Sequence, residues 1–138
     1  MADEEKRGVR MRLALLADVH ANAEALRAVL ADLDRCGGAD RLLVAGDVAL
    51  LGPDPQEVIE LLMAREATAV RGNTDHFLFN TNWRAFEPED EEGKADRALR
   101  LWTLEQLDER ALAWLRALPL QRELQVSGRR GLLGHASP

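Results

Sequence analysis

Five polar residues, each just beyond the end of a short apolar segment, could carry out chemistry in this chain. They are Asp18, His20, Asp47, Asn73 and His135. All offer an oxygen or an imidazole nitrogen and none offers a thiolate, a set that suits Mn, Fe, Zn, Ni or Co ions rather than a structural zinc site of cysteines. A carboxylate such as Asp47 can bridge two ions, and ions about 3.5–4 Å apart can clamp a phosphoryl group and generate a hydroxide nucleophile.

These residues require strands that bring them to one edge of a sheet. Segments 13–17, 41–45 and 67–71 are short apolar runs, and the first is typical of a strand buried on both faces. If the chain stays extended, Asp18 and His20 leave it on the same side, at the carboxyl end where open α/β sheets bind ligands. For this pair alone, a helix-capping Asp and a loop His are an equally good interpretation.

The segments between the strands predict helices. Asn22 can cap a helix that ends at Gly37, and a Gly-Pro-Asp-Pro turn at 52–55 leads into a second helix. The resulting β-α-β-α-β order implies a parallel sheet with right-handed crossovers. Residues 94–118 predict two helices that break near 103–108, and strands 120–126 and 131–134 predict a hairpin.

Four aromatic residues gather after the third strand. They are Phe77, Phe79, Trp83 and Phe86. We interpret them as a local cluster that anchors a loop, with a wall for the substrate as the alternative. The acidic run 87–92 predicts a solvated surface loop.

Composition describes one globular domain. We expect residues 1–10 to be a flexible polar N-terminus and residues 11–138 to form the domain. The net charge of −6 argues against general nucleic-acid binding but not against a small phosphorylated substrate. The single cysteine, Cys36, excludes an intrachain disulfide and favours a reducing compartment. With no signal peptide or membrane span in the sequence, we expect a cytoplasmic protein that does not bind membranes.

Four ordered motifs resemble those of the calcineurin-like metallophosphoesterases. They are the DxH of Asp18-Val19-His20, the GD of Gly46-Asp47, the GNxD of Gly72-Asn73-Thr74-Asp75, and His135. The Gly-Pro-Asp-Pro turn and the final His-Ala-Ser-Pro resemble a bacterial and archaeal phosphodiesterase subgroup. The resemblance implies an α/β fold, a layered β-sandwich flanked by helices, whose second sheet is incomplete in this chain.

The resemblance also implies roles and cofactors. Asp18 and His20 would hold one divalent ion, Asp47 would bridge, and Asn73 and His135 would hold a second ion. Manganese is expected, with Fe, Zn, Ni or Co as alternatives. Asn22 would support the ligands or cap the following helix. Arg71 would orient the Asn73 loop or simply end a strand.

Two departures from the family pattern refine the expected activity. Many members have a histidine after the metal-binding Asn, where this chain has Thr74, which is no comparable acid near neutral pH. His76 is close in sequence but need not face the site. This resembles subgroup members that favour phosphodiesters with good leaving groups, so we expect phosphodiester hydrolysis.

The second departure is the late GHxH motif, which this sequence lacks. The residues of this sequence leave each ion one ligand short. We therefore interpret the sequence as an N-terminal portion of a longer enzyme or a natural short form. If the chain is complete, we expect it to bind metal weakly or to hold only one ion. We also expect it to dimerise along the open sheet edge. The alternative function is a non-catalytic protein-binding scaffold with the same fold, whereas a Rossmann-type domain is disfavoured because no glycine-rich loop follows the first strand.

Overall fold

A computed structural model describes residues 10–136 of the chain. Three strands form a parallel sheet in the order β1 (Leu13–Leu16), β2 (Arg41–Val44) and β3 (Thr68–Ala69). In register, Leu13 pairs with Arg41, and Leu43 pairs with Thr68. The expected β-α-β-α-β order is confirmed.

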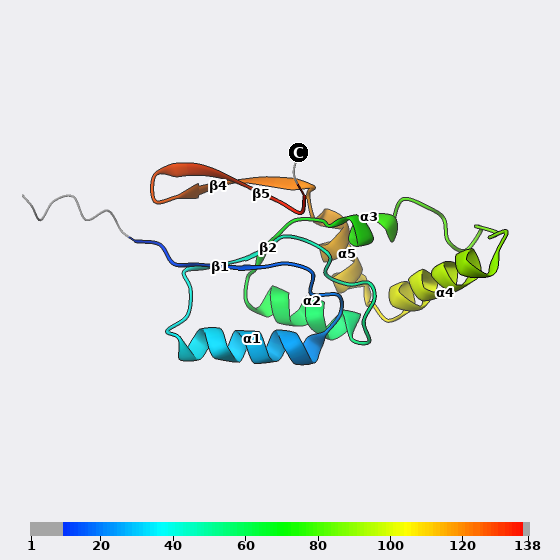
Figure 1. Cartoon of the computed structure of the whole chain (residues 1–138), viewed down its shortest axis with the longest axis horizontal. Coiled ribbons are helices and arrows are strands. Elements are labelled where there is room, and N and C mark those ends of the chain that lie inside the picture. The colour runs from blue at the N-terminus through cyan, green and yellow to red at the C-terminus, as the bar shows by residue number, and fades with distance from the viewer. Residues whose placement is uncertain (1–9, 137–138) are drawn as a thin grey trace, which may run out of the picture.

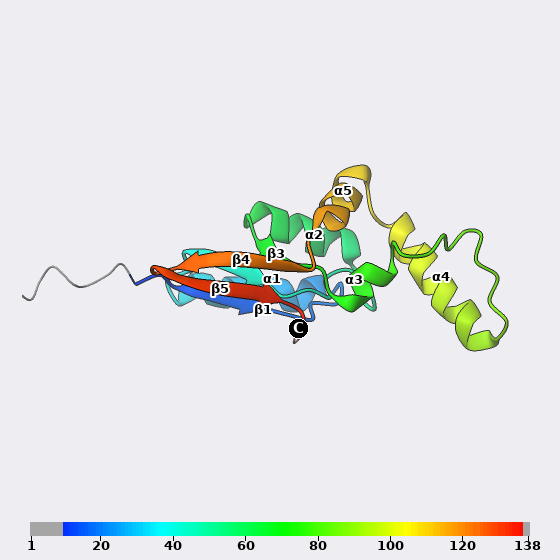
Figure 2. The ribbon, with the colours of Figure 1, turned by 90° about the horizontal axis from the view of Figure 1, so that it is seen from above.

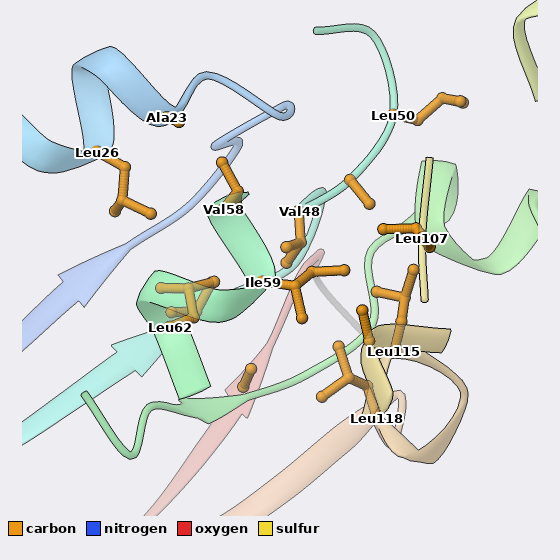
Figure 3. Packing of buried hydrophobic residues seen from close by; sticks show 14 of the residues in the cluster. Ala23, Leu26, Val48, Leu50, Val58, Ile59, Leu62, Leu107, Leu115 and Leu118 are labelled. Carbon is orange, nitrogen blue, oxygen red and sulfur yellow. The ribbon is translucent and has the colours of Figure 1, made fainter. Parts of the chain in front are cut away.

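Two crossover helices cover one face of the sheet. Helix α1 (Ala23–Arg35) begins at Asn22, whose side chain accepts from the Ala25 N–H, and helix α2 (Pro55–Ala64) begins with the predicted proline. Both lie below the sheet in Figure 1. Figure 3 shows Val58, Ile59 and Leu62 of α2 reaching into the core that the helices share.

A hairpin covers the other face. Strands β4 (Gln121–Val126) and β5 (Arg129–Gly134) pair antiparallel around the predicted turn, where Ser127 has a φ of 48° and Gly128 a φ of 77°. Both turn residues therefore adopt the left-handed conformation that matches the twist of a two-residue hairpin. The hairpin lies above the sheet in Figure 1, so the sheet sits between a helical layer and a β layer.

The side chains of strand β2 point alternately into two hydrophobic cores, one on each face of the sheet. Leu42 and Val44 pack in the core with the helices, whereas Leu43 and Ala45 pack against Leu124 and Leu133 of the hairpin. Because successive side chains of a strand point to opposite faces, a run of apolar residues serves both layers. β2 is thus buried on both faces.

Strand β1 does not meet that expectation. Leu13 and Leu15, which face the hairpin side, are 36% and 62% exposed. Strand β1 emerges beyond the edge of β5 in Figure 2, and the hairpin core reaches only β2 and the β3 segment. The prediction of burial on both faces was wrong for β1, because its apolar sequence says nothing about whether a layer covers it.

The two helices before the hairpin differ, since the second packs in the core beside α2 and the first forms an extension at one side. Helices α4 (Glu91–Glu105) and α5 (Glu109–Ala117) confirm the predicted break, and α4 projects away from the sheet (Figures 1 and 2). The acidic run is not wholly a loop, since Asp90 caps α4 and Glu91 and Glu92 occupy its first turn. Carboxylates there complement the N–H groups of the helix end. We call the loop 78–90 together with α4 the cap. Among the described residues, no helix is both long and apolar enough to cross a membrane.

Candidate metal centre

The loops after β1 and β2 run side by side beyond the ends of the strands. The Asp18 N–H donates to the Gly46 carbonyl at 3.1 Å, and the His20 N–H donates to the Asp47 carbonyl at 2.9 Å. These bonds continue the pairing of the strands into two loops that carry candidate ligands. The sequence therefore places Asp18, His20 and Asp47 together because parallel strands end at one edge.

The conformation of these loops differs from the predicted one. Asp18, His20 and Asp47 have φ values of 56°, 47° and 56°, in the left-handed region. The argument that Asp18 and His20 leave the chain on the same side assumed an extended chain, and that assumption was wrong. β1 ends at Leu16, and hydrogen bonds to the neighbouring loop turn the chain. Such strain at non-glycine residues is typical of functional loops.

Both histidines are held by backbone carbonyls. His20 Nδ1 lies 3.0 Å from the Leu50 oxygen, and His135 Nδ1 lies 2.7 Å from the Ala45 oxygen. A carbonyl only accepts, so each neutral ring carries its proton on Nδ1 and leaves a lone pair on Nε2. Metal-binding histidines are oriented in this way.

The two free nitrogens converge on one carboxylate. His20 Nε2 lies 3.6 Å from Asp47 Oδ2 and 3.6 Å from Asp18 Oδ1, while His135 Nε2 lies 3.5 Å from the same Asp47 Oδ2. His135 Nε2 is also 2.9 Å from Asn73 Oδ1. Ligand atoms of Asp18, Asp47 and His135 all lie within 4.8 Å of one another.

A cluster of acceptors that face one another calls for cations between them. Nε2 lone pairs, carboxylate oxygens and an amide oxygen repel one another unless a proton or a metal ion intervenes. The donor set has no thiolate, which fits Mn, Fe, Zn, Ni or Co. The residues present therefore fit divalent metal, and all five expected residues lie in this cluster.

The third loop approaches too closely for any side chain at Gly72. A Cβ there would lie 2.0 Å from Asp47 Oδ1. Gly72 leads into α3 (Asn73–Phe77), a short helix where the sequence predicts a loop. The Thr74 N–H of this helix donates to Asp47 Oδ1 at 3.1 Å. Five residues are too few to show helical periodicity, so this element could not be predicted.

Asp75 supports the site, although no role in metal binding was predicted for it. Its carboxylate is fully buried and accepts from the N–H groups of Val48 at 2.9 Å, Ala49 at 3.2 Å and Gly72 at 3.0 Å. Burial raises the pKa of this carboxyl, while the three N–H bonds lower it and the charge of Asp47 raises it further. Asp75 thus joins the Asp47 loop to the Asn73 loop. Its place at the end of the GNxD motif was the available signal.

The other candidates lie at the margin of the cluster. Asn22 caps α1, one of its two expected roles. The hydroxyl of Thr74 is buried and has no hydrogen-bond partner within residues 10–136, whereas His76 is exposed on α3 with its ring beside Phe77. The Arg71 N–H donates to the Pro119 carbonyl at 2.8 Å, and its guanidinium donates to the Arg116 carbonyl. Arg71 thereby ties the start of the Asn73 loop to the end of α5.

One family model matches nearly the whole chain. The sequence model of the calcineurin-like phosphoesterase superfamily domain matches residues 11–137. An uncharacterized protein of Methanocaldococcus jannaschii is 31% identical over 130 residues, which are 94% of this chain and 51% of that protein. The chain thus spans about half the length of the curated relative that it matches.

Solved structures show the same likeness. A metallophosphoesterase from Sphaerobacter thermophilus matches with a TM-score of 0.63 and 33% identity, over 82% of this chain and 43% of that one. A hypothetical protein from Pyrococcus horikoshii matches with a TM-score of 0.69 and 22% identity, over 88% and 53%. A protein proposed to be a diadenosine tetraphosphatase matches with a TM-score of 0.60 and 24% identity, over 82% and 45%. The last two matches concern the fold alone.

Proposed function

The chain belongs to the calcineurin-like phosphoesterase superfamily, and on this premise we propose that it hydrolyses phosphoesters, most readily phosphodiesters, with two divalent ions at the candidate metal centre. The observation that supports the proposal most is the convergence of two imidazole Nε2 atoms on one oxygen of Asp47, at 3.6 and 3.5 Å. We assign Asp18 and His20 to one ion, Asn73 and His135 to the other, and Asp47 to both.

The residues around the centre have different roles in the proposed reaction. Bound ions would supply a hydroxide nucleophile and neutralise charge on the phosphoryl group. Asp47 is only 4% exposed, and the Thr74 N–H fixes one of its oxygens, so its orientation is set before substrate arrives. The side chain of Asp18 is 58% exposed and stands at the open side, where a phosphoryl group can approach.

Thr74 shapes the choice of leaving group. It occupies the position next to Asn73, and a hydroxyl there does not supply a proton as an imidazolium would. Esters whose leaving group departs as a stable anion do not need that proton. We therefore propose phosphodiesters with good leaving groups as substrates, with manganese as the working ion and a small phosphorylated compound as the natural substrate.

Hydrolysis of bis(4-nitrophenyl) phosphate by the Mn²⁺-loaded chain tests the proposal. We expect turnover that disappears with chelator and in Asp47→Asn, which keeps the shape of the side chain but removes the charge that bridges two cations. Asp54→Asn is the matched control, because Asp54 makes no side-chain capping bond at the start of α2. Diadenosine tetraphosphate, suggested by one structural neighbour, is a second substrate to assay.

Two results would contradict the proposal. Turnover that survives Asp47→Asn would mean that Asp47 does not hold the ions. A Mn²⁺-loaded, folded chain that hydrolyses neither compound would favour the scaffold alternative. Mn²⁺ titration calorimetry on the same samples separates loss of metal from loss of chemistry.

A further inference from the structure

A cavity of about 610 Å³ lies between the cap and α5, within the range of volumes that small molecules occupy in proteins. Its apolar wall consists of Leu78, Phe79, Leu101, Leu104 and Leu112. None of the residues that line the cavity belongs to the candidate metal centre. A molecule bound there would therefore be held by residues other than those assigned to hydrolysis.

The apolar side chains of this wall are anchored on one side and uncovered on the other. Phe79, Leu104 and Leu112 pack against the main hydrophobic core, but each remains only half-buried. Covering the remaining apolar surface with a ligand would remove it from water, which is favourable. Leucines predominate in the wall, and a flexible aliphatic chain can follow their irregular surface closely.

Both sides of the cavity are attached to fixed parts of the molecule. Arg97 Nε donates to the Trp83 carbonyl at 2.8 Å, and Arg97 Nη2 donates to the Arg84 carbonyl at 3.0 Å, so the loop of the cap is joined to α4. On the other side, Ala111 and Leu115 of α5 are buried in the main hydrophobic core. A ligand therefore finds the cavity already formed and does not have to order its walls.

Two arginines place positive charge at the border of the cavity, against one glutamate. Arg84 is 78% exposed and pairs only loosely with Glu105, at 3.9 Å. The Arg116 guanidinium lies 5.0 Å from the centre of the Phe79 ring, and within residues 10–136 no carboxylate pairs with it. A guanidinium can bind a carboxylate through two parallel hydrogen bonds. The cavity therefore joins an apolar interior to cationic groups that an anion can reach.

We propose that this cavity binds a fatty acid of medium chain length, with its alkyl chain against the leucines and its carboxylate at Arg84 and Arg116. Such a molecule carries one apolar chain and one negative charge at its end, the combination that the lining offers. A small anion such as acetate would leave the apolar wall uncovered. The net charge of −6 disfavours anions that carry several charges, which points to a ligand with a single charge.

Calorimetric titration with acetate, hexanoate, octanoate and decanoate, below the concentrations at which they form micelles, tests the proposal. Each methylene that finds a place against the wall should tighten binding by about fourfold. Affinity should therefore rise along the series until the cavity is filled, and acetate should not bind measurably. The titrations need no metal ion, because the lining holds none of the assigned metal ligands.

A charge variant tests the two arginines. Arg84→Gln combined with Arg116→Gln should weaken octanoate binding by about 2- to 25-fold, the range for two exposed ion pairs. The same variant should bind 1-octanol, which has the same chain length but no charge, as tightly as the wild type does. The matched control combines Arg110→Gln with Arg122→Gln, which removes the same charge from two exposed residues that do not line the cavity.

A filled cavity tests the apolar wall without removing any part of it. Thr81 lines the cavity, so Thr81→Trp should place a large ring there and abolish octanoate binding. Asn80→Trp is the matched control, because Asn80 is exposed and does not line the cavity. Circular dichroism and urea unfolding establish that both variants are folded.

The outcomes separate this proposal from the proposed hydrolysis. Absence of octanoate binding to the folded wild-type chain would overturn it, as would an affinity that does not change from hexanoate to decanoate. Unchanged octanoate binding in the folded charge variant or in folded Thr81→Trp would also overturn it. Binding that grows with chain length, weakens in the charge variant and is lost in Thr81→Trp supports it, whether or not the Mn²⁺-loaded chain hydrolyses the aryl diester.

Discussion

Replacing Gly72 with alanine tests whether the metal centre depends on the close approach of two loops. An added Cβ would lie 2.0 Å from Asp47 Oδ1, 2.3 Å from Asp47 N and 2.8 Å from Asp47 Cγ, whereas ordinary contact begins at 3.4 Å. The carboxylate or the loop must therefore move by more than about 1 Å. Gly72 has φ −84° and ψ 177°, a conformation open to alanine, so the effect is steric alone.

The size of that displacement sets the expected loss. A 1 Å misplacement of reacting groups costs about 10²-fold in rate, and overpacking costs about 1–3 kcal/mol of the free energy of unfolding. We expect Gly72→Ala to lower Mn²⁺ affinity and turnover of the aryl diester by about 10- to 100-fold. Calorimetric titration, the hydrolysis assay and urea unfolding measure the three quantities.

Gly131→Ala is the matched control. A Cβ at Gly131 in β5 meets no atom within 4 Å, and alanine restricts the unfolded chain, so stability should hold or rise slightly. Folded Gly72→Ala that binds Mn²⁺ as tightly as the wild type would refute the reasoning. It would mean that the position of the Asp47 carboxylate does not determine metal binding.

Four other predictions follow from the same contacts. Asp47→Ala should abolish binding of both ions while His135→Ala mainly weakens one, since only Asp47 is assigned to both; equal metal contents would contradict the bridge. Thr74→His should speed hydrolysis of alkyl esters by about 10²–10⁴-fold, because their leaving groups need a proton; no gain would show that position 74 does not face the leaving group. Hydrogen bonds from the Ala111 N–H and from Gln56 lower the pKa of Asp108. The stability that the Asp108 carboxylate contributes is therefore full above the ordinary Asp pKa and is lost as the pH falls through the lowered pKa. Asp108→Asn should destabilise the chain at pH 7 and progressively less as the pH falls, as acid unfolding curves would show. The exposed hairpin-side face of β1 should bring two copies together, and Leu15→Glu should lower the mass found by light scattering; a wild-type monomer at every concentration would argue against it.

The spacing of apolar residues, together with the turn residues, was sufficient to predict the order of the helices and strands. The apolar positions of α1 and α2, the proline at the start of α2 and the glycine of the hairpin turn each act locally, so the sequence alone determines them. Parallel strands share an edge, which is why Asp18, Asp47 and Asn73 could be predicted to meet. His135 follows β5 of the antiparallel hairpin, so this rule does not place it. The motif resemblance then added their expected roles.

Properties that depend on tertiary context could not be predicted in this way. The left-handed turns at Asp18 and His20 arise from hydrogen bonds to the Asp47 loop, and no local rule requires them. The exposure of Leu15 depends on which layer covers β1. The cavity between the loop 78–84, α4 and α5 arises from the relative placement of these elements. The aromatic cluster in the sequence does not predict that placement.

Asp75 has a consequence for how an ion enters and leaves this protein. Three backbone N–H groups from two loops converge on its buried carboxylate. The polypeptide therefore holds the two ligand-bearing loops in place without help from a metal ion. Exchange of one ion for another then requires no refolding, and the resident ion should follow cellular supply as much as intrinsic affinity. The same property makes cobalt a suitable spectroscopic replacement, because its visible absorption would report the ligand geometry of an otherwise unchanged fold.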